Sequence, residues 1–155
     1  MSGQRPAVES DRRALEALIA HELAGTAYAD VPAYFLRLAL EGRTAEARVI
    51  VFEQDAGVVG CAIFGEVAGS VGTGRVHFIA ATAAGRVAEV DAKLCQAAVR
   101  DLADHGARLV VAELADDAAL AAYGALLRTC GFSEAGRVDD YYHDGVALVI
   151  LAMPT

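Results

Sequence analysis

The sequence predicts one mixed α/β domain, a central mixed sheet with helices on both faces in the order βααβββαβαββ. Three observations predict it. The 155 residues are 55% hydrophobic, which is enough for one well-formed core. Two hairpin patterns, at 47–64 and 132–153, predict antiparallel strands. Between them a buried strand, a helix and a second buried strand predict a crossover connection, and this mixture implies helices on both sides of the sheet.

The N-terminal third is predicted to be a short strand followed by two helices. The strand is placed around Pro6 to Val8, and Ser10 is the expected N-cap of a helix over 11–23. A second helix is expected to start at Asp30 and to stop at Gly42. The loop over 25–29 between them could cover a substrate, but its residues indicate no chemistry.

The middle of the chain is predicted to form three strands and then a long helix. The strands are expected at 47–53, 58–64 and 75–81, with a turn over 54–57. After a tight loop, apolar residues recur at helical spacing from Val90 to Leu102. A strand that leads into a helix N-terminus leaves backbone N–H groups free to receive an anion.

The last third is predicted to be a strand, a helix and a hairpin. Gly106 is the expected end of the long helix, and a buried strand is expected over 108–113. A helix is expected to start at Asp116 or Asp117 and to close at Gly131. Strands over 132–142 and 146–153 are joined by an Asp-Gly turn at 143–145.

Charge and cysteine content narrow the function classes. The formal net charge of −8 argues against a nucleic acid or an anionic membrane as partner, because both favour basic surfaces. Cys61, Cys95 and Cys130 lie in apolar segments without metal-ligand spacing, so we expect buried, reduced thiols, no metal and a cytoplasmic protein. The polar N-terminus is not expected to be a signal peptide, and no apolar run is long enough to cross a membrane.

Several phrases, in this element order, resemble the GNAT superfamily of acyl-CoA N-acyltransferases. They are DAGVVGCAIFG at 55–65, the Gly-Phe pair at 131–132 and GRVDDYYHDGVALVI at 136–150. The resemblance covers nearly the whole chain, 1–155, as a single domain. It implies an acetyltransferase that uses acetyl-CoA as co-substrate.

The resemblance also implies where acetyl-CoA would bind. The pantetheine arm would pair with the strand at Ile79, Ala80 and Ala81. The pyrophosphate would lie on the following turn, whose family pattern is Arg or Gln, two residues, Gly, one residue, then Gly or Ala. Here that turn consists of Arg86, Val87, Ala88, Glu89, Val90 and Asp91.

Two positions depart from the family pattern. Glu89 and Asp91 stand where small residues are expected, and both are negative where a phosphate would lie. Acids in the first turn of a helix also complement its dipole, so they could instead cap the helix. The family's frequent proton-donating tyrosine is replaced by Leu127, whereas Tyr123 lies one helical turn earlier on the same stripe.

A base for an amine nucleophile has several candidates. Histidine is the residue type suited to the task, and His77 lies on the strand beside the expected acyl site, where it could face the site or the core. Glu53, Glu113, Tyr141 and Tyr142 are further candidates. The two tyrosines alternate along one strand, so only one can face a cleft. The catalytic set proposed from the sequence is His77, Tyr123 and Tyr142.

The sequence therefore leaves two functions open. The first is an N-acyltransferase acting on a small-molecule or peptide amine. The second is a GNAT-like binding or partner subunit that has lost CoA binding. A homodimer formed through the apolar last strands is compatible with both.

Overall fold

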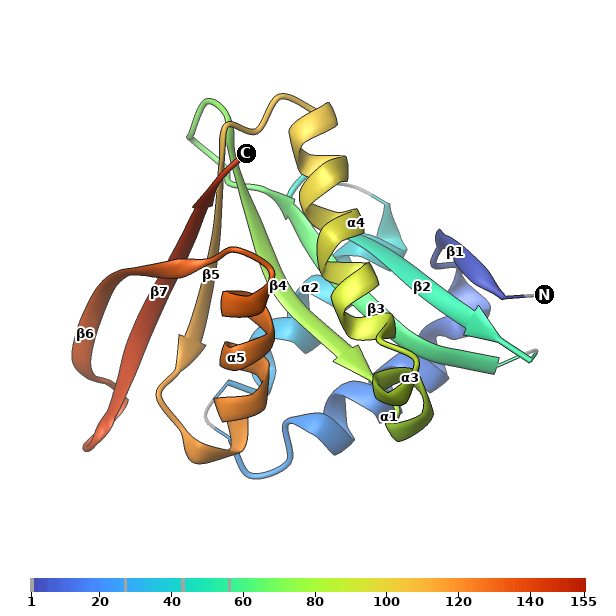
Figure 1. The fold of residues 1–155 in the computed structure, drawn as a ribbon, viewed down its shortest axis with the longest axis horizontal. Coiled ribbons are helices and arrows are strands. Elements are labelled where there is room, and N and C mark those ends of the chain that lie inside the picture. Colours follow the sequence, from blue (N-terminus) through green and yellow to red (C-terminus); the bar gives the residue numbers. More distant parts are fainter. Residues whose placement is uncertain (1, 27, 43, 56) are drawn as a thin grey trace.

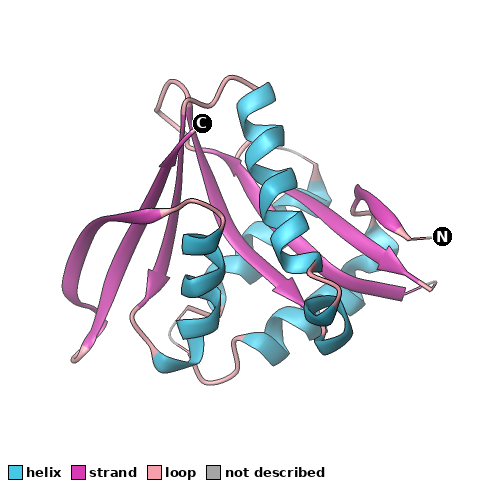
Figure 2. Cartoon of the chain, in the orientation of Figure 1, coloured by secondary structure: helices cyan, strands magenta, loops and turns pink. Residues whose placement is uncertain are grey.

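The computed structural model describes residues 2–26, 28–42, 44–55 and 57–155. Within them the chain forms one seven-stranded sheet in the order β1-β2-β3-β4-β5-β7-β6 (Figures 1 and 2). The strands are β1 Gly3–Pro6, β2 Arg48–Gln54, β3 Gly57–Glu66, β4 Thr73–Ala81, β5 Leu109–Ala115, β6 Ser133–His143 and β7 Val146–Pro154. Neighbouring strands are antiparallel except β4 and β5, which run parallel. This confirms the predicted fold class and mixed sheet.

Helices cover both faces of the sheet, as predicted. The helices are α1 Arg12–Glu22, α2 Asp30–Glu41, α3 Ala83–Val87, α4 Val90–Asp104 and α5 Ala121–Thr129. In Figure 1, α4 and α5 lie in front of the sheet while α1 and α2 lie behind it. Glycines allow α4 to come close, because a Cβ at Gly60 would lie 2.9 Å from Leu94 and one at Gly74 would lie 2.8 Å from Leu102. The core fills both layers between helices and sheet.

The N-terminal prediction was displaced by several residues. Strand β1 occupies Gly3–Pro6 instead of 6–8, and it pairs with β2. The reason is Asp11, whose carboxylate accepts the Val8 N–H at 2.8 Å and two hydrogen bonds from Arg5. Val8 is thereby taken out of the strand, and α1 begins after Asp11 without a side-chain cap from Ser10.

Other predicted boundaries agree more closely. Helix α2 ends at Gly42, which adopts φ +66° as a C-terminal glycine should. The predicted turn over 54–57 and loop over 25–29 each include one residue, 56 and 27, that lies outside the described part of the chain. Cys61 and Cys95 are buried, whereas Cys130 is only partly buried, so the prediction of three buried thiols was wrong for Cys130.

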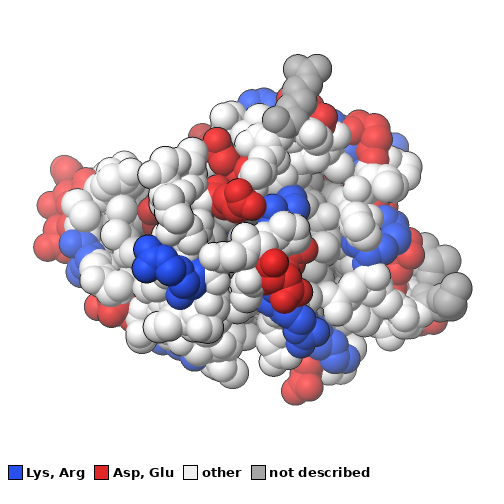
Figure 3. All heavy atoms as spheres, turned by 90° about the horizontal axis from the view of Figure 1, so that it is seen from above, with Lys and Arg blue, Asp and Glu red and all other residues white. Residues whose placement is uncertain are grey.

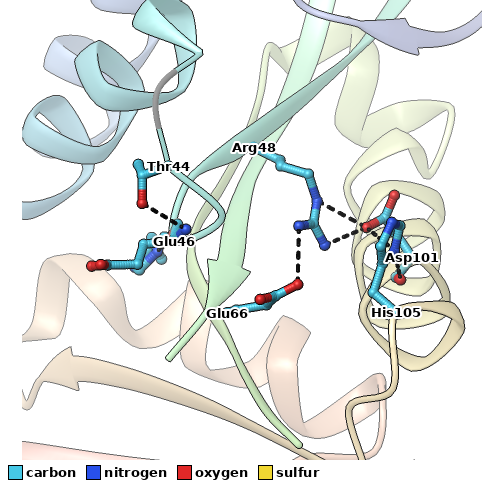
Figure 4. A network of polar contacts seen from close by, with 7 residues as sticks. Thr44, Glu46, Arg48, Glu66, Asp101 and His105 are labelled. Atoms are coloured by element: carbon cyan, nitrogen blue, oxygen red, sulfur yellow. Dashed lines mark hydrogen bonds and ion pairs between the residues drawn. The ribbon is translucent and has the colours of Figure 1, made fainter. Parts of the chain in front are cut away.

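A cluster of charged side chains connects β2, β3 and α4. Figure 4 shows Arg48 of β2 pointing to Asp101 of α4 and to Glu66 of β3. Its guanidinium donates to Asp101 Oδ1 at 2.6 Å and 3.1 Å. This pair fastens α4 to the sheet.

The surface seen from above carries basic and acidic side chains in small, interspersed groups (Figure 3). That face therefore shows no broad basic field of the kind that attracts polyanions. None of the helices in the described residues is long and apolar enough to span a membrane.

Candidate active site

The sheet opens between its two parallel strands. Strands β4 and β5 are paired only from Thr73–Leu109 to Val76–Ala112 among the described residues, and they separate beyond that point. The separation follows a β-bulge, because β3 pairs Ile63 with Phe78 and Phe64 with Val76, which leaves His77 as the extra residue. A bulge bends its strand, and here it turns β4 away from β5. The result is a split with α5 on one side of it (Figure 1).

The peptide groups of β4 alternate between β3 and the split. Thr82 N–H donates to the Val59 carbonyl of β3 at 2.9 Å, so Ala80 also faces β3 while Ile79 and Ala81 face the split. Two side chains occupy the ends of this edge. Tyr28 Oη donates to the His77 carbonyl at 2.6 Å, and Arg86 Nη1 donates to the Ala81 carbonyl at 2.9 Å.

This arrangement separates the three predicted strand contacts. Ile79 presents its N–H and C=O between the two occupied carbonyls, and Ala81 presents its N–H. Ala80, in contrast, pairs with Cys61 of β3. Ala80 therefore has no peptide group to offer a ligand in the split, whereas Ile79 has two.

A cavity of about 80 Å³ lies at the mouth of the split. Its walls come from α1, β4, α3, α4 and α5 and the turn before α5, and it is lined by Glu22, Phe78, Ile79, Ala81, Arg86, Asp91, Ala119, Leu120, Ala122, Tyr123 and Leu126. The cavity joins the free edge of β4 to the turn that follows the strand. It thus connects the two regions where the sequence predicted cofactor contacts.

Tyr123 is the polar side chain of α5 in this cavity. It is 8% exposed, and its ring packs on Phe78 with centroids 4.8 Å apart. Its hydroxyl is buried and has no hydrogen-bond partner within the described residues. Burial raises the pKa of Tyr123 well above its usual value, so the hydroxyl keeps its proton at neutral pH. A buried hydroxyl without a partner needs an explanation, and a polar ligand atom that reaches it is one.

A second polar side chain, Tyr142, lies on the side of the split nearer α1 and α2. Tyr142 of β6 packs edge-on against Tyr28, with ring centroids 6.5 Å apart. Burial and the nearby Glu113 raise the pKa of Tyr142 to about 12. Tyr141 is 58% exposed, and its ring packs edge-on against that of Tyr142 with centroids 5.0 Å apart. The expected regular alternation of the two tyrosines is wrong, because the β6–β7 register shifts between Val138 and His143. Glu113 of β5 pairs with Arg75 of β4 at 3.0 Å.

His77 occupies a packing position. It is 3% exposed, and its ring stacks on Phe35 of α2 with centroids 3.5 Å apart. Its Nε2 lies 2.9 Å from the Glu46 carbonyl oxygen. Burial lowers the pKa of His77 to about 4, so the ring is neutral at pH 7. These contacts join β4 to α2 and direct the ring away from the split.

The turn after β4 contains an additional short helix. Thr82 caps α3 by accepting the Gly85 N–H at 3.1 Å, and the chain then reverses at Glu89. Glu89 holds φ +56°, the left-handed conformation that suits glycine. Asp91 Oδ1 accepts the Ala92 N–H at 2.9 Å in the first turn of α4, as the capping interpretation of this acid predicted. Glu89, the N-cap residue, makes no side-chain capping hydrogen bond, so that interpretation was wrong for Glu89.

The other members of this turn face solvent or each other. Val87 is 87% exposed and Ala88 is partly buried. Val90, the first residue of α4, is instead fully buried in the core. Arg86 Nη1 donates to Glu22 Oε1 of α1 at 2.9 Å as well as to the Ala81 carbonyl. The cation is therefore already paired.

Comparison with known proteins gives no match to a family model or to a curated protein. Solved structures do match. A protein of the GNAT acetyltransferase family from Desulfovibrio desulfuricans superposes with a TM-score of 0.86 at 21% identity, over 99% of both chains. The similarity therefore lies in the path of the backbone.

The protein has the GNAT fold. A ribosomal-protein-alanine N-acetyltransferase from Brucella melitensis has a TM-score of 0.78 at 18% identity, over 99% of both chains. A Salmonella typhimurium structure named as an acetyltransferase with its cofactor acetyl-CoA has a TM-score of 0.75 at 20% identity, over 99% of this chain and 93% of that one. At these identities the likeness establishes the fold.

Acetyl-CoA fits one half of the site and not the other. The split offers the Ile79 peptide groups and the unpartnered Tyr123 hydroxyl, which suit a neutral amide arm and a thioester. The following turn offers a self-capped helix and a glutamate where the backbone would have to meet a diphosphate. Within the described residues no group of three His, Cys, Asp or Glu side chains could hold a metal.

Sequence reasoning missed Tyr28 and Glu22. Both belong to the α1–α2 region, yet they contact β4 and α3 over separations of 49 and 64 residues. No local sequence pattern predicts contacts over such separations. The only available signal was a tyrosine within a loop that could cover a substrate.

Proposed function

We propose that the protein is an N-acetyltransferase that moves an acetyl group from acetyl-CoA to an amine. The observation that supports this most strongly is the split between β4 and β5, with free Ile79 peptide groups on its edge and an unpartnered tyrosine hydroxyl beside it. The GNAT fold is consistent with this activity, but a fold alone does not determine function.

The residues would divide the work as follows. Ile79 would align the donor arm along β4, and Tyr123 would give its proton to the leaving thiolate. The donor supplies an activated acyl carbon: a C–N bond forms, the C–S bond breaks, the amine nitrogen loses a proton and the sulfur gains one. Tyr142 and Glu113 would bind the acceptor, which reacts as the neutral amine.

His77 receives a different role in this proposal. Its ring is neutral, buried and turned toward Phe35 and Glu46, so it would position β4 instead of removing a proton from the amine. The bulge at His77 is what separates the strands. Replacing His77 should therefore affect donor binding and stability together.

Calorimetric titration of acetyl-CoA, followed by thiol-release assays over a panel of small-molecule and peptide amines, tests the proposal. We expect measurable binding and turnover with at least one amine. Tyr123→Phe should lower kcat at least about tenfold, as expected for loss of general acid catalysis, with a smaller effect on KM. Tyr34→Phe, at an exposed position of α2, is the matched control. No binding and no turnover would refute the proposal.

The second candidate is a non-catalytic binding or partner subunit. Asp91 on its own helix end, Glu89 in the turn and Leu127 at the family's tyrosine position favour it. In that case an amine panel would give no turnover, even with donor bound. The proposed homodimer is tested separately, by light scattering at high protein concentration.

A further inference from the structure

We propose that the protein recognises its donor through the acyl-pantetheine arm alone, and that the nucleotide diphosphate contributes nothing to donor affinity. The donor class is thus an acyl-pantetheine thioester, with acetyl-CoA accepted only as a carrier of that arm. This inference rests on the proposed function, because it concerns the same split and cavity.

The first argument is that Asp91 occupies a backbone donor that a phosphate would need. Asp91 Oδ1 accepts the Ala92 N–H at 2.9 Å in the first turn of α4. Asp91 also lines the cavity at the mouth of the split. An arriving phosphate would meet a carboxylate on the helix end, and the two negative charges would repel each other. One N–H group at the positive end of the helix dipole is thus already used.

The second argument is that Glu89 places another carboxylate in the same turn. It lies in the connection between α3 and α4, two residues before Asp91, with φ +56°. The backbone of Glu89 adopts a conformation that glycine adopts readily, whereas its side chain adds bulk and negative charge. A diphosphate that approached this backbone would come close to the Glu89 carboxylate, and the two negative charges would repel each other.

The third argument is that the neighbouring cations, Arg86 and Lys93, already contact other groups of the chain. Arg86 Nη1 donates to both Glu22 Oε1 and the Ala81 carbonyl, each at 2.9 Å. Lys93 Nζ donates to the Ala88 carbonyl at 3.3 Å and lies 5.9 Å from the centre of the Phe52 ring. Arg86 is thus paired with the carboxylate of Glu22, and Lys93 contacts a carbonyl and a ring of the chain itself. A polyanion would compete with Glu22 for Arg86.

The arm, in contrast, meets a suitable surface. The Ile79 N–H and C=O face the split between two occupied carbonyls, as an amide-bearing arm requires. Tyr123 lines the cavity, and its buried hydroxyl has no partner in the described chain. These groups are neutral, so they select amides and a thioester and not a charged nucleotide.

The test compares S-acetyl-pantetheine with acetyl-CoA by calorimetry on the full chain, at low and high salt. We expect the wild type to bind the two within about threefold of each other. We expect higher salt to leave acetyl-CoA affinity unchanged or to raise it, because screening weakens repulsion. Wild-type affinity for acetyl-CoA about tenfold or more above that for S-acetyl-pantetheine, and falling with salt, would overturn the inference.

Variants separate the charge from the fold. Asp91→Ala combined with Glu89→Gly should raise acetyl-CoA affinity about tenfold or more while S-acetyl-pantetheine affinity stays within about twofold. Glu89→Gln with Asp91→Asn, which keeps the side-chain shapes, should move acetyl-CoA affinity in the same direction. Asp104→Asn, an exposed acid at the far end of α4, is the matched control and should change neither affinity. Equal gains for both ligands would contradict the charge argument.

The outcomes also distinguish this inference from the proposed function. Binding of S-acetyl-pantetheine without turnover of any amine would refute the transferase and leave arm recognition in place. Turnover with acetyl-CoA and no binding of S-acetyl-pantetheine would support the transferase and refute recognition through the arm alone. No binding of either thioester would overturn both.

Discussion

Replacing Glu89 by glycine should stabilise the protein, although it removes a side chain. Glu89 holds φ +56° between α3 and α4, in an exposed position. A residue with a Cβ costs about 1–2 kcal/mol in this left-handed conformation. Glycine has no such cost but loses about 0.5–1 kcal/mol more backbone entropy on folding. We therefore expect the free energy of unfolding to rise by about 0.5–1 kcal/mol.

Urea denaturation and thermal melting measure this change. For a chain of this size about 1 kcal/mol corresponds to about 2–4 °C, so the melting temperature should rise by about 1–4 °C. Glu89→Ala is the control, because it removes the same charge but keeps a Cβ, and it should give no gain. If both variants behaved alike, or if the glycine variant were less stable than the wild type, the conformational argument at Glu89 would be refuted.

Three further predictions concern the framework of the split. In the folded protein His77 has a pKa of about 4, whereas in the unfolded chain its pKa is near 6.5. The free energy of unfolding should therefore fall by up to about 3 kcal/mol as the pH drops from 6.5 to 4. Urea titrations across this window should show a shallower fall in His77→Gln; an unchanged fall would disprove the assignment. Gly65→Ala should cost about 3 kcal/mol, because its Cβ would collide with the Glu46 backbone, while Gly57→Ala meets only the Gln54 carbonyl oxygen at 3.8 Å; equal losses in denaturant midpoint would contradict this. Tyr28→Phe should lower the free energy of unfolding by about 1–3 kcal/mol, because it leaves the His77 carbonyl without its donor. Tyr34→Phe, at an exposed position, should lower it by less than about 0.5 kcal/mol. Equal melting temperatures for the two variants would contradict a stabilising role for the Tyr28 hydrogen bond.

Much of the fold followed from local patterns. The stripe beginning at Val90 marked α4, Gly42 marked the end of α2, and the Asp-Gly turn marked the β6–β7 hairpin. Each of these signals acts within a few residues, through side-chain periodicity or through a backbone angle that only some residues adopt easily. The displacement of β1 shows the limit, because Asp11 removes Val8 from the strand through contacts that no periodicity encodes.

The site depended more on tertiary structure. Sequence alone placed Ile79, Arg86, Glu89 and Asp91 on a strand and the turn after it, and it identified the two acids as unusual there. Only the folded chain decided that Ala80 faces β3, that Arg86 is paired with Glu22, and that Asp91 caps its own helix. Strand alternation is defined only once the register and its bulges are known.

The roles of the aromatic and histidine side chains were decided in the same way. From sequence, His77 was a candidate base and Tyr123 a candidate proton donor. Folding packs His77 against Phe35, 42 positions away by residue number, and leaves the Tyr123 hydroxyl buried and unpartnered at the cavity. A side chain's chemistry depends on its desolvation and on its neighbours, and those neighbours come from distant segments. The sequence by itself therefore determined which groups were available, and the packing of α1, α2 and α5 around the split determined what each can do.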